Sequence, residues 1–319
     1  MRAYHKPAPD APAALMQIAP PEPGPGQIRL KIAACGLNFA DLLMLKGQYQ
    51  DTPPAPFTLG MEVAGVVDAL GHGVSSPAIG TRVAVFGGQG GLAEHGCFDA
   101  HRAVPLPDAM SMTDAAAFLI AYGTSHLALD HRARLQPGET LLVLGAAGGV
   151  GLTAVEVGKL MGATVIACAR GADKLEAARH AGADHLIDAA TDDIRTIVKS
   201  LGGADVVYDP VGGDQWQAAF RACKPEARLL PIGFASGDVP QIPANHLLVK
   251  NLSVLGVYWG GYMTFNLRAV TDSLAVLMEW YAQGRLKPHV SHILPLDRVE
   301  DGLELLRSRA STGKVVITI

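Results

Sequence analysis

The amino-acid sequence predicts an α/β protein in which a doubly wound parallel sheet of six strands is joined to a second, β-rich domain. From Ala115 onward, apolar strand-like runs alternate with helical stretches. This alternation is typical of a parallel sheet with helices on both faces. In residues 1 to about 120, short strand-like runs are instead broken by glycine and proline, which indicates a β-rich domain.

Length and composition agree with two globular domains. The chain has 319 residues, of which 49% are hydrophobic and 18% charged, so it can bury a sizeable core and is not disordered. The net charge of -4 gives no reason to expect nucleic acid or an anionic membrane as the main partner.

The sequence shows no secretory or membrane segment. The N-terminal residues MRAYHKPAPD lack the apolar core of a signal peptide, and the longest nearly apolar run, residues 141–155, is short and rich in glycine. The cysteines are scattered without paired spacing, which favours a reducing compartment. We therefore expect a cytoplasmic protein. The four cysteines are Cys35, Cys97, Cys168 and Cys223.

The β-rich part is predicted from apolar runs bounded by turn residues. The proline-rich segment Pro7–Pro25 is interpreted as a surface connection. The expected strands are Gln27–Ala34, Glu62–Leu70, Thr81–Phe86 and Gly96–Val104.

The remaining chain begins with the helical stretch Ala115–Leu129. The six strands expected in the parallel sheet are Thr140–Leu144, Thr164–Cys168, His185–Ile187, Asp205–Tyr208, Arg228–Ile232 and Ser253–Val257. A long helix is expected over Thr264–Gln283. The tail is expected to form a strand from His292, a helix over Asp297–Arg309 and a last strand over Lys314–Ile319.

The stretch from Gly138 to Gly162 carries the main functional signal. An apolar strand is followed by a glycine-rich turn and then by a helix over Val150–Met161. The small residues Ala146, Gly148 and Gly151 occupy the three positions of a G-x-G-x-x-G spacing, with alanine in the first. Small side chains let the backbone approach a pyrophosphate, which the positive helix N-terminus attracts. The alternative is an ordinary tight turn between a strand and a helix.

This stretch also resembles a family signature. Gly138-Glu139, Leu142, Ala146 to Gly149, Gly151 and Lys159 fit the NADPH:quinone oxidoreductase (zeta-crystallin-like) family of the zinc-free medium-chain dehydrogenase/reductase superfamily, whereas Glu156 replaces the usual glutamine. The resemblance covers essentially the whole chain. It implies a Rossmann dinucleotide-binding domain over residues 123–259. It also implies a discontinuous chaperonin-10-like β-barrel catalytic domain made of residues 1–122 and 260–319.

The residues after the second strand bear on the choice of cofactor. An enzyme that prefers NAD normally places an acid here to accept from the ribose hydroxyls. This chain has Ala169 and Arg170, with Lys174 shortly after. Two cations suit a 2′-phosphate, and Lys174 matches the lysine that the family uses there, so we expect NADPH. The alternative is that both cations solvate a helix start, and Asp173 nearby would repel phosphate unless it caps that helix.

Loops at the carboxyl ends of the later strands are the expected ligand-binding edge of such a sheet. The resemblance places the nicotinamide and its ribose against these loops and against a threonine in the sequence AYGTSHLAL. Each residue could also be plain turn chemistry. The expected cofactor-binding residues are Thr124, Ala147, Gly148, Gly149, Val150, Arg170, Lys174, Val211, Gly233, Phe234, Ala235, Tyr258 and Trp259.

No metal is expected. Zinc-dependent relatives have Cys and then Gly-His-Glu as catalytic ligands, where this chain has Asn38 and Met61. An amide and a thioether are poor zinc ligands. Alternate residues of a strand lie about 7 Å apart, so at most two neighbours of a run could reach one ion. The run in question is His95, Cys97, Asp99 and His101.

Without zinc, another group must polarise the substrate carbonyl. Asn38 is the first candidate, as an amide donor toward the substrate oxygen. Tyr49 matches a tyrosine that zinc-free quinone and enoyl reductases carry beside the substrate, where a phenol can donate to a developing enolate. Asp41 is interpreted as structural. The alternatives are that Asn38 is a turn residue and that Tyr49 is a packed aromatic.

These observations predict an NADPH-dependent, zinc-independent reductase that transfers hydride to a small-molecule quinone or α,β-unsaturated carbonyl. One alternative is an enoyl-thioester reductase, which would need a basic patch for the carrier phosphates. Another is a non-catalytic, crystallin-like NADPH-binding protein. The apolar sixth strand Ser253–Val257 lies at a sheet edge, and relatives commonly pair this edge, so we expect a homodimer through it.

Overall fold

The computed structural model describes residues 1–319 and divides the chain into two compact units. The first unit is discontinuous and consists of Met1–Ile120 and Pro288–Ile319, whereas the second is Ala121–Lys287. No helix in either unit is long and apolar enough to cross a membrane.

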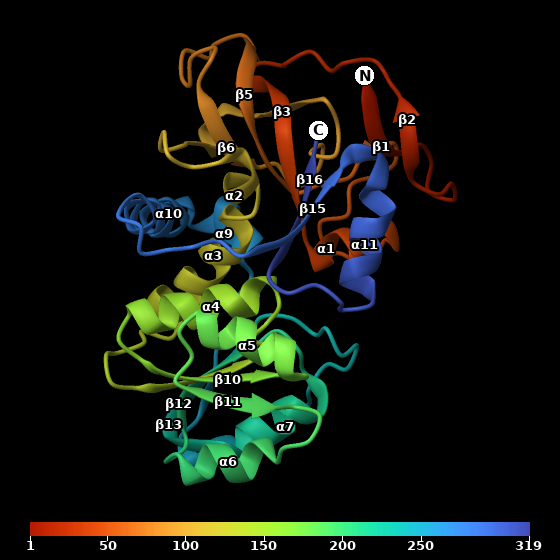
Figure 1. Ribbon diagram of the computed structural model, residues 1–319. Helices are drawn as coiled ribbons and strands as arrows, with labels where there is room; N and C mark the ends of the chain where they lie inside the picture. Colours follow the sequence, from red (N-terminus) through yellow and green to blue (C-terminus); the bar gives the residue numbers. More distant parts are fainter. The chain divides into compact units, whose positions relative to one another are not determined.

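The first unit is built around a seven-stranded sheet of order β15-β16-β3-β5-β6-β8, in which β7 also pairs with β3 (Figure 1). The C-terminal strand β16 lies antiparallel to β3, so the tail of the chain returns to the first unit as expected. The bounds are β3 Gln27–Leu37, β5 Glu62–Leu70, β6 Arg82–Phe86, β7 His95–Asp99, β8 Ala103–Pro105, β15 Val290–Pro295 and β16 Lys314–Thr318.

Three short strands form a second, smaller sheet in this unit, of order β2-β1-β4. Its strand β2, Ala14–Gln17, lies inside the proline-rich segment that we interpreted only as a surface connection, and it pairs antiparallel with β1. The expected strand Gly96–Val104 is also interrupted, by the 3₁₀ turn Ala100–Arg102. The other elements are β1 Arg2–Lys6, β4 Phe57–Thr58, α1 Phe39–Leu45, α2 Met112–Ala116, the 3₁₀ turn Leu296–Arg298 and α11 Val299–Arg307.

The second unit contains a parallel six-stranded sheet of order β11-β10-β9-β12-β13-β14, which confirms the doubly wound arrangement (Figure 1). Its first strand matches the expected bounds, and most of the others differ by one to a few residues. The strands are β9 Thr140–Leu144, β10 Thr164–Ala169, β11 His185–Asp188, β12 Ala204–Asp209, β13 Cys223–Pro231 and β14 Ser253–Val254. The helices between them are α4 Gly149–Leu160, α5 Ala172–His180, α6 Ile194–Ser200, α7 Gly213–Ala222 and α8 Ala244–Lys250.

The edge strand β14 is shorter than the expected Ser253–Val257. Only Ser253 and Val254 pair with β13, and the N–H of Leu255 adds a last bond to the Leu229 carbonyl at 2.8 Å. Beyond it, the carbonyl of Gly256 accepts from Arg132 Nε (3.2 Å) instead of extending the ladder. The pairing with β13 therefore does not reach Gly256.

The two expected long helices are both interrupted. Residues 115–129 divide into the end of α2, then α3 Leu119–His126 and the start of a π-helical turn, Leu127–Arg132. Residues 264–283 divide at Asn266 into α9 Trp259–Phe265 and α10 Leu267–Ala282. The Asn266 side chain accepts from the N–H of Ala269 (3.3 Å), so a helix-capping residue overrides the helical composition around it.

The boundary between the units also differs from the expected one. Residues 260–287 pack within the second unit instead of joining the catalytic domain. His126 Nδ1 bonds to Ser273 Oγ at 2.9 Å, and the N–H of Lys287 donates to Glu156 Oε1 at 2.7 Å. These contacts attach α10 and the chain beyond it to α3 and α4.

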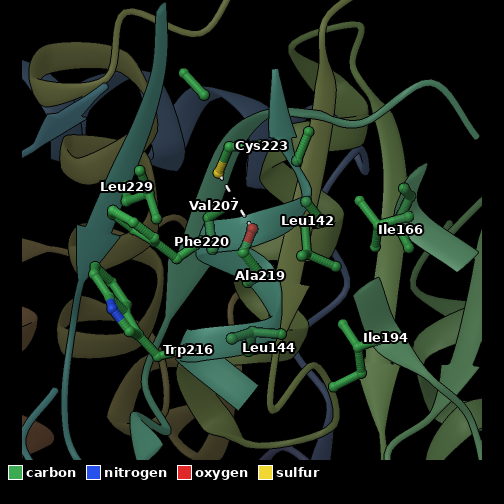
Figure 2. Close-up of a cluster of buried hydrophobic side chains, with 14 of the residues drawn as sticks. Leu142, Leu144, Ile166, Ile194, Val207, Trp216, Ala219, Phe220, Cys223 and Leu229 are labelled. Carbon is green, nitrogen blue, oxygen red and sulfur yellow. Dashed lines mark hydrogen bonds between the residues drawn. The ribbon is translucent and has the colours of Figure 1, made fainter. Parts of the chain in front are cut away.

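The core of the second unit lies between the sheet and the helices α6 and α7 (Figure 2). All residues of β9 are buried, as expected for a parallel strand with both faces covered. Trp216 and Phe220 from α7 stack with ring centroids 6.3 Å apart, and the Cys223 thiol donates to the Ala219 carbonyl at 3.3 Å. This packing fixes the strands whose carboxyl ends carry the candidate site.

Candidate cofactor-binding turn and buried ion-pair site

The turn between β9 and α4 has the geometry that a pyrophosphate requires. Gly145 adopts a φ of +57°, so the sharp turn is made one position before Ala146. A Cβ on Gly151 would lie 2.2 Å from the Gly145 carbonyl oxygen, so glycine there allows α4 to pack against the turn. The helix begins after Gly148, and its first N–H groups have no partner within the helix. The turn can therefore receive an anionic group on its backbone.

The loops after β12 and β13 pack together beside this turn. The N–H of Ala235 donates to the Pro210 carbonyl at 3.1 Å, and a Cβ on Gly145 would lie 2.8 Å from Val211 Cγ2. The buried Asp209 carboxylate shapes the first loop by accepting from the N–H of Val211 at 2.7 Å. Burial raises the pKa of Asp209 despite these bonds. The structure thus brings Val211 and the segment Gly233-Phe234-Ala235 to the edge where the glycine turn lies.

Trp259 packs against Gly123, the residue before Thr124 on α3. Thr124 is buried on α3, and a Cβ on the adjacent Gly123 would lie 2.7 Å from Trp259 Nε1. Tyr258 is the N-cap residue of α9, directly before Trp259. The loop after β14 is therefore packed against α3.

A buried hydroxyl network supports the start of α4, and none of its members was predicted. Ser125 Oγ lies 2.8 Å from Thr153 Oγ1 and 3.1 Å from the Tyr208 hydroxyl, and it donates to the Val150 carbonyl at 3.1 Å. The network joins α3, α4 and β12. Hydroxyl residues in apolar runs were the only sequence signal, and such residues commonly bond to backbone.

Arg170 and Lys174 lie at the N-terminal side of α5, which begins after Gly171. Arg170 is exposed and Lys174 is half-buried. Asp188, at the end of the neighbouring strand β11, accepts from the N–H groups of Gly171 (3.1 Å) and Ala190 (2.9 Å). The Asp188 carboxylate thus accepts hydrogen bonds from backbone N–H groups beside the two cations.

In the first unit, Asn38 precedes α1 and joins two clusters of polar groups. Its backbone N–H donates to Asp41 Oδ2 at 2.8 Å. Its side chain is turned toward the sheet, where Oδ1 accepts from Lys314 Nζ at 2.7 Å and Nδ2 donates to Glu62 Oε1 at 3.1 Å. Nδ2 also contacts the Gly36 carbonyl at 3.3 Å. Both amide hydrogens of Asn38 therefore have acceptors within the protein. The sequence-based expectation was an amide donor toward the substrate oxygen, and it did not foresee these internal acceptors.

Glu62 and Lys314 form a buried ion pair beneath Asn38. Their side chains are 1% and 6% exposed, and both charges have further partners. Lys314 Nζ donates to the Leu37 carbonyl at 2.9 Å, and Glu62 Oε2 accepts from the N–H of Ile120 at 3.0 Å. Sequence reasoning missed both residues, because they lie on β5 and on the last strand.

Asp41 and Tyr49 have strongly perturbed acidities. Asp41 is fully buried and its Oδ1 has no hydrogen-bond partner, so burial raises the pKa to about 7, against the opposing effects of the Asn38 N–H and Lys314. Burial and then the charges of Asp51 and Asp41 raise the pKa of Tyr49 to about 12. Tyr49 therefore stays a neutral phenol that can donate a hydrogen bond at physiological pH.

The Asp41 pKa predicts a pH-dependent stability. Between its ordinary pKa of 3.8 and about 7, the folded state keeps a proton that the unfolded state has lost. Stability from this group therefore falls as pH rises through that window, by on the order of 4 kcal/mol. The Asp41→Asn variant lacks this titration. Urea unfolding should therefore show that the free energy of unfolding of the variant, relative to that of the wild type, is higher at pH 7.5 than at pH 4.5. A difference between the two proteins that does not change with pH would contradict the assignment.

The two positions at which zinc-dependent relatives carry their ligands, Asn38 and Met61 here, do not form a metal-binding group. Met61 is buried, and no cluster of three or more His, Cys, Asp or Glu side chains could hold an ion. In the alternating run on β7, His95 Nε2 lies 3.4 Å from Asp68 Oδ2, and burial raises the pKa of Cys97 to about 11. Metal independence remains a prediction.

A surface cavity of about 280 Å³ lies between α1 and the end of α11 in the first unit. Apolar side chains of α1 share its walls with basic groups. The lining residues are Phe39, Leu42, Leu43, Leu45, Lys46, Arg307 and Arg309.

Comparison with known proteins assigns both parts of the chain. Residues 24–108 match the alcohol dehydrogenase GroES-like domain, and residues 149–274 match the zinc-binding dehydrogenase family. The chain is 38% identical to the mouse quinone oxidoreductase-like protein 2, over 97% of this chain and 89% of that protein. It is 35% identical to the human synaptic vesicle membrane protein VAT-1 homolog, over 94% of this chain and 80% of that protein.

A solved structure gives the same result. The quinone oxidoreductase of Thermus thermophilus, described together with its NADPH complex, superimposes with a TM-score of 0.90 at 34% identity, over 100% of both chains. The two domain matches, the parallel sheet with its glycine turn, and full-length similarity point to one family. The chain belongs to the medium-chain dehydrogenase/reductase superfamily, among its quinone oxidoreductase-like members.

Proposed function

We propose that this protein is an NADPH-dependent reductase that transfers hydride to a quinone or to an α,β-unsaturated carbonyl without a catalytic metal. The observation that carries the proposal is the glycine turn, whose backbone fits a pyrophosphate and is followed along the sheet edge by Arg170 and Lys174. The similarity to a quinone oxidoreductase described in complex with NADPH supports the same cofactor.

Each part of the sheet edge has a role in this proposal. Ala147 to Val150 hold the pyrophosphate at the start of α4, and Arg170 with Lys174 hold the 2′-phosphate. The nicotinamide end is held by the later loops and by α3. The residues assigned to that end are Thr124, Val211, Gly233, Phe234, Ala235, Tyr258 and Trp259.

When bound, NADPH would supply a hydride, with its electron pair, to an electron-poor carbon of the substrate. Negative charge would then develop on the carbonyl oxygen, and one proton from solvent would complete the hydroquinone or the saturated carbonyl. Tyr49 donates a hydrogen bond to that oxygen as a neutral phenol. Asn38 donates the amide hydrogen that contacts the Gly36 carbonyl in the absence of substrate.

A kinetic assay tests this function. Purified protein is mixed with NADPH and a panel of quinones and enones, and NADPH oxidation is followed by absorbance. We expect turnover with at least one acceptor, with Asn38→Ala and Tyr49→Phe each lowering kcat about 100- to 1000-fold, as for loss of one oxyanion donor. Tight NADPH binding without turnover on any acceptor would instead support the non-catalytic alternative.

Metal independence has its own test. Asn38 and Met61 replace thiolate and imidazole at the diagnostic positions, so dialysis against a strong chelator should leave NADPH oxidation and the thermal midpoint unchanged. Elemental analysis of the purified protein should find substoichiometric zinc. One zinc per chain, with activity lost on chelation and restored by zinc, would show the assignment to be wrong.

Enoyl-thioester reduction is the second candidate, and the cavity beside α1 favours it. Lys46, Arg307 and Arg309 provide the basic groups that carrier phosphates would need, next to apolar side chains. The discriminating substrates are an enoyl-CoA and the same enoyl group on a short, uncharged thiol. A much lower KM for the CoA ester, lost in Lys46→Ala, supports this candidate. Equal KM values would exclude a role for the phosphates.

We also propose a homodimer through the β14 edge. Two neighbouring apolar side chains of helix α8, which precedes β14 in the chain, are each 77% exposed and could add apolar contacts to such an interface; they are Leu248 and Val249. The Leu255→Lys variant would bring two charges together at a two-fold axis, so it should sediment as a monomer. Leu201→Lys, on the turn after α6, is the matched control and should not change the species. A Leu255→Lys protein that sediments as the wild type would refute the edge dimer.

A further inference from the structure

We infer that Lys314, on the last strand of the chain, is a positioning residue that orients and polarises the Asn38 amide. The inference rests on the role proposed above for Asn38. The juxtaposition that carries it is the contact of the Lys314 ammonium with Asn38 Oδ1 at 2.7 Å, beside a shared ion pair with Glu62.

The two charged partners leave the amide only one orientation. An ammonium can only donate and a carboxylate can only accept, so Oδ1 must face Lys314 and Nδ2 must face Glu62. A flipped amide would place its NH₂ against the ammonium. The ambiguity that usually attends an asparagine side chain is therefore removed by Lys314 and Glu62.

This orientation also selects the hydrogen that is available to a substrate. One amide hydrogen bonds to the Glu62 carboxylate at 3.1 Å, and the other contacts the neutral Gly36 carbonyl at 3.3 Å. Bonds to charged groups are roughly twice as strong as bonds between neutral groups. A substrate carbonyl can therefore displace only the longer bond to Gly36, and the donated hydrogen always leaves from the same side of the amide.

The burial of the ion pair makes the polarisation effective. With side chains 1% and 6% exposed, Glu62 and Lys314 are shielded from water and salt. A positive charge at Oδ1 draws electrons from the amide nitrogen, and linked hydrogen bonds polarise one another in a low dielectric. Lys314 thus makes the remaining N–H of Asn38 a stronger donor without touching the substrate.

The first experiment compares three variants of Lys314 and Glu62. Lys314→Met alone leaves an unpaired buried carboxylate and is expected to fold poorly. The double variant Lys314→Met/Glu62→Gln removes both charges together and keeps acceptor and donor atoms near Asn38. Lys314→Arg keeps the charge. Lys159→Met, which removes the exposed pair with Asp184 in the second unit, is the matched control.

For the double variant we expect NADPH affinity within about twofold of wild type and kcat lower by about 10- to 100-fold, below the loss of a whole oxyanion donor. Lys314→Arg should recover most of kcat, and Lys159→Met should match the wild type. Equal kcat in the folded double variant and in the wild type would overturn the inference and leave the proposed function intact.

A second readout does not depend on turnover. The side-chain ¹⁵N–¹H₂ resonances of Asn38, assigned through Asn38→Gln, report both amide hydrogens. In the wild type they should be well separated because one hydrogen bonds to a carboxylate, and they should converge in the double variant. If the wild type binds NADPH but reduces no acceptor, the function fails while this measurement still decides the positioning. Unchanged Asn38 resonances in the double variant would overturn the inference.

Discussion

The double variant Arg170→Ala/Lys174→Ala is expected to bind NADPH about 10² to 10⁴ times more weakly than the wild type, with NADH affinity almost unchanged. Each lost bond to a charged phosphate costs about 1.5–3 kcal/mol, and the two side chains are assigned to the same 2′-phosphate. NADH lacks that phosphate, so it serves as an internal reference. Fluorescence titration with both cofactors measures the two affinities.

The control for this prediction lies on the same helix. Arg179 is exposed near the other end of α5, where it pairs with Glu176, so Arg179→Ala removes one positive charge from this helix without removing a phosphate contact. The Arg179→Ala variant should lower the affinity for NADPH by less than about twofold, as expected for a distant screened charge. An equal loss of affinity for NADPH and NADH in the double variant would show that the two cations only support the fold.

Replacing Gly151 with alanine is expected to disrupt both stability and cofactor binding. A Cβ at this position would lie 2.2 Å from the Gly145 carbonyl oxygen and 2.9 Å from Ala146 Cα, both of them backbone atoms. Gly→Ala inside an exposed helix normally gains about 1 kcal/mol, whereas overpacking here should lose about 1–3 kcal/mol. The overpacking should also shift α4 and displace its anion-binding N–H groups. The affinity for NADPH should therefore fall at least about tenfold.

The Gly148→Ala variant distinguishes the effect of packing on stability from the effect of ligand approach on NADPH affinity. Its Cβ would meet only the Gly145 oxygen at 3.4 Å, an ordinary contact, so the free energy of unfolding should stay within about 0.5 kcal/mol of wild type. Its NADPH affinity should still fall, since the added methyl group would stand where the backbone approaches the phosphates. Chemical unfolding and NADPH titration of both variants check the pair. Wild-type stability in Gly151→Ala would contradict the packing argument.

The features that could be predicted from the sequence are those encoded locally. The strand β9 has the expected bounds, and α4 begins one residue before the expected start, because an apolar run, a turn and a helix follow one another within a few residues. The parallel sheet was predicted from the alternation of strands and helices, and its doubly wound arrangement was predicted from the match of six such strands to the dinucleotide-binding fold. The shortened β14 could not be predicted, because the strand ends where Arg132, distant in sequence, binds the Gly256 carbonyl.

The candidate site in the first unit shows the same limit. Asn38 and Asp41 were singled out from one short segment, but the acceptors that occupy the Asn38 amide come from Gly36 and from Glu62. Lys314 stands 252 positions beyond Glu62, and a lone lysine in an apolar strand reads as a surface residue. The boundary at Lys287 was missed for a similar reason, since α10 attaches to the second unit through side chains such as Ser273.

The return of β16 to β3 has a consequence for synthesis on the ribosome. Ala121–Lys287 is continuous, so it can fold as soon as it has emerged, whereas the first unit lacks β15 and β16 until Pro288–Ile319 has been made. At about 5–20 residues per second, the intervening residues delay closure by tens of seconds. During that interval, Glu62 has no ammonium partner and the β3 edge is open to other chains. The nascent first unit therefore keeps an unpaired strand edge until the end of synthesis, whereas the second unit is complete earlier.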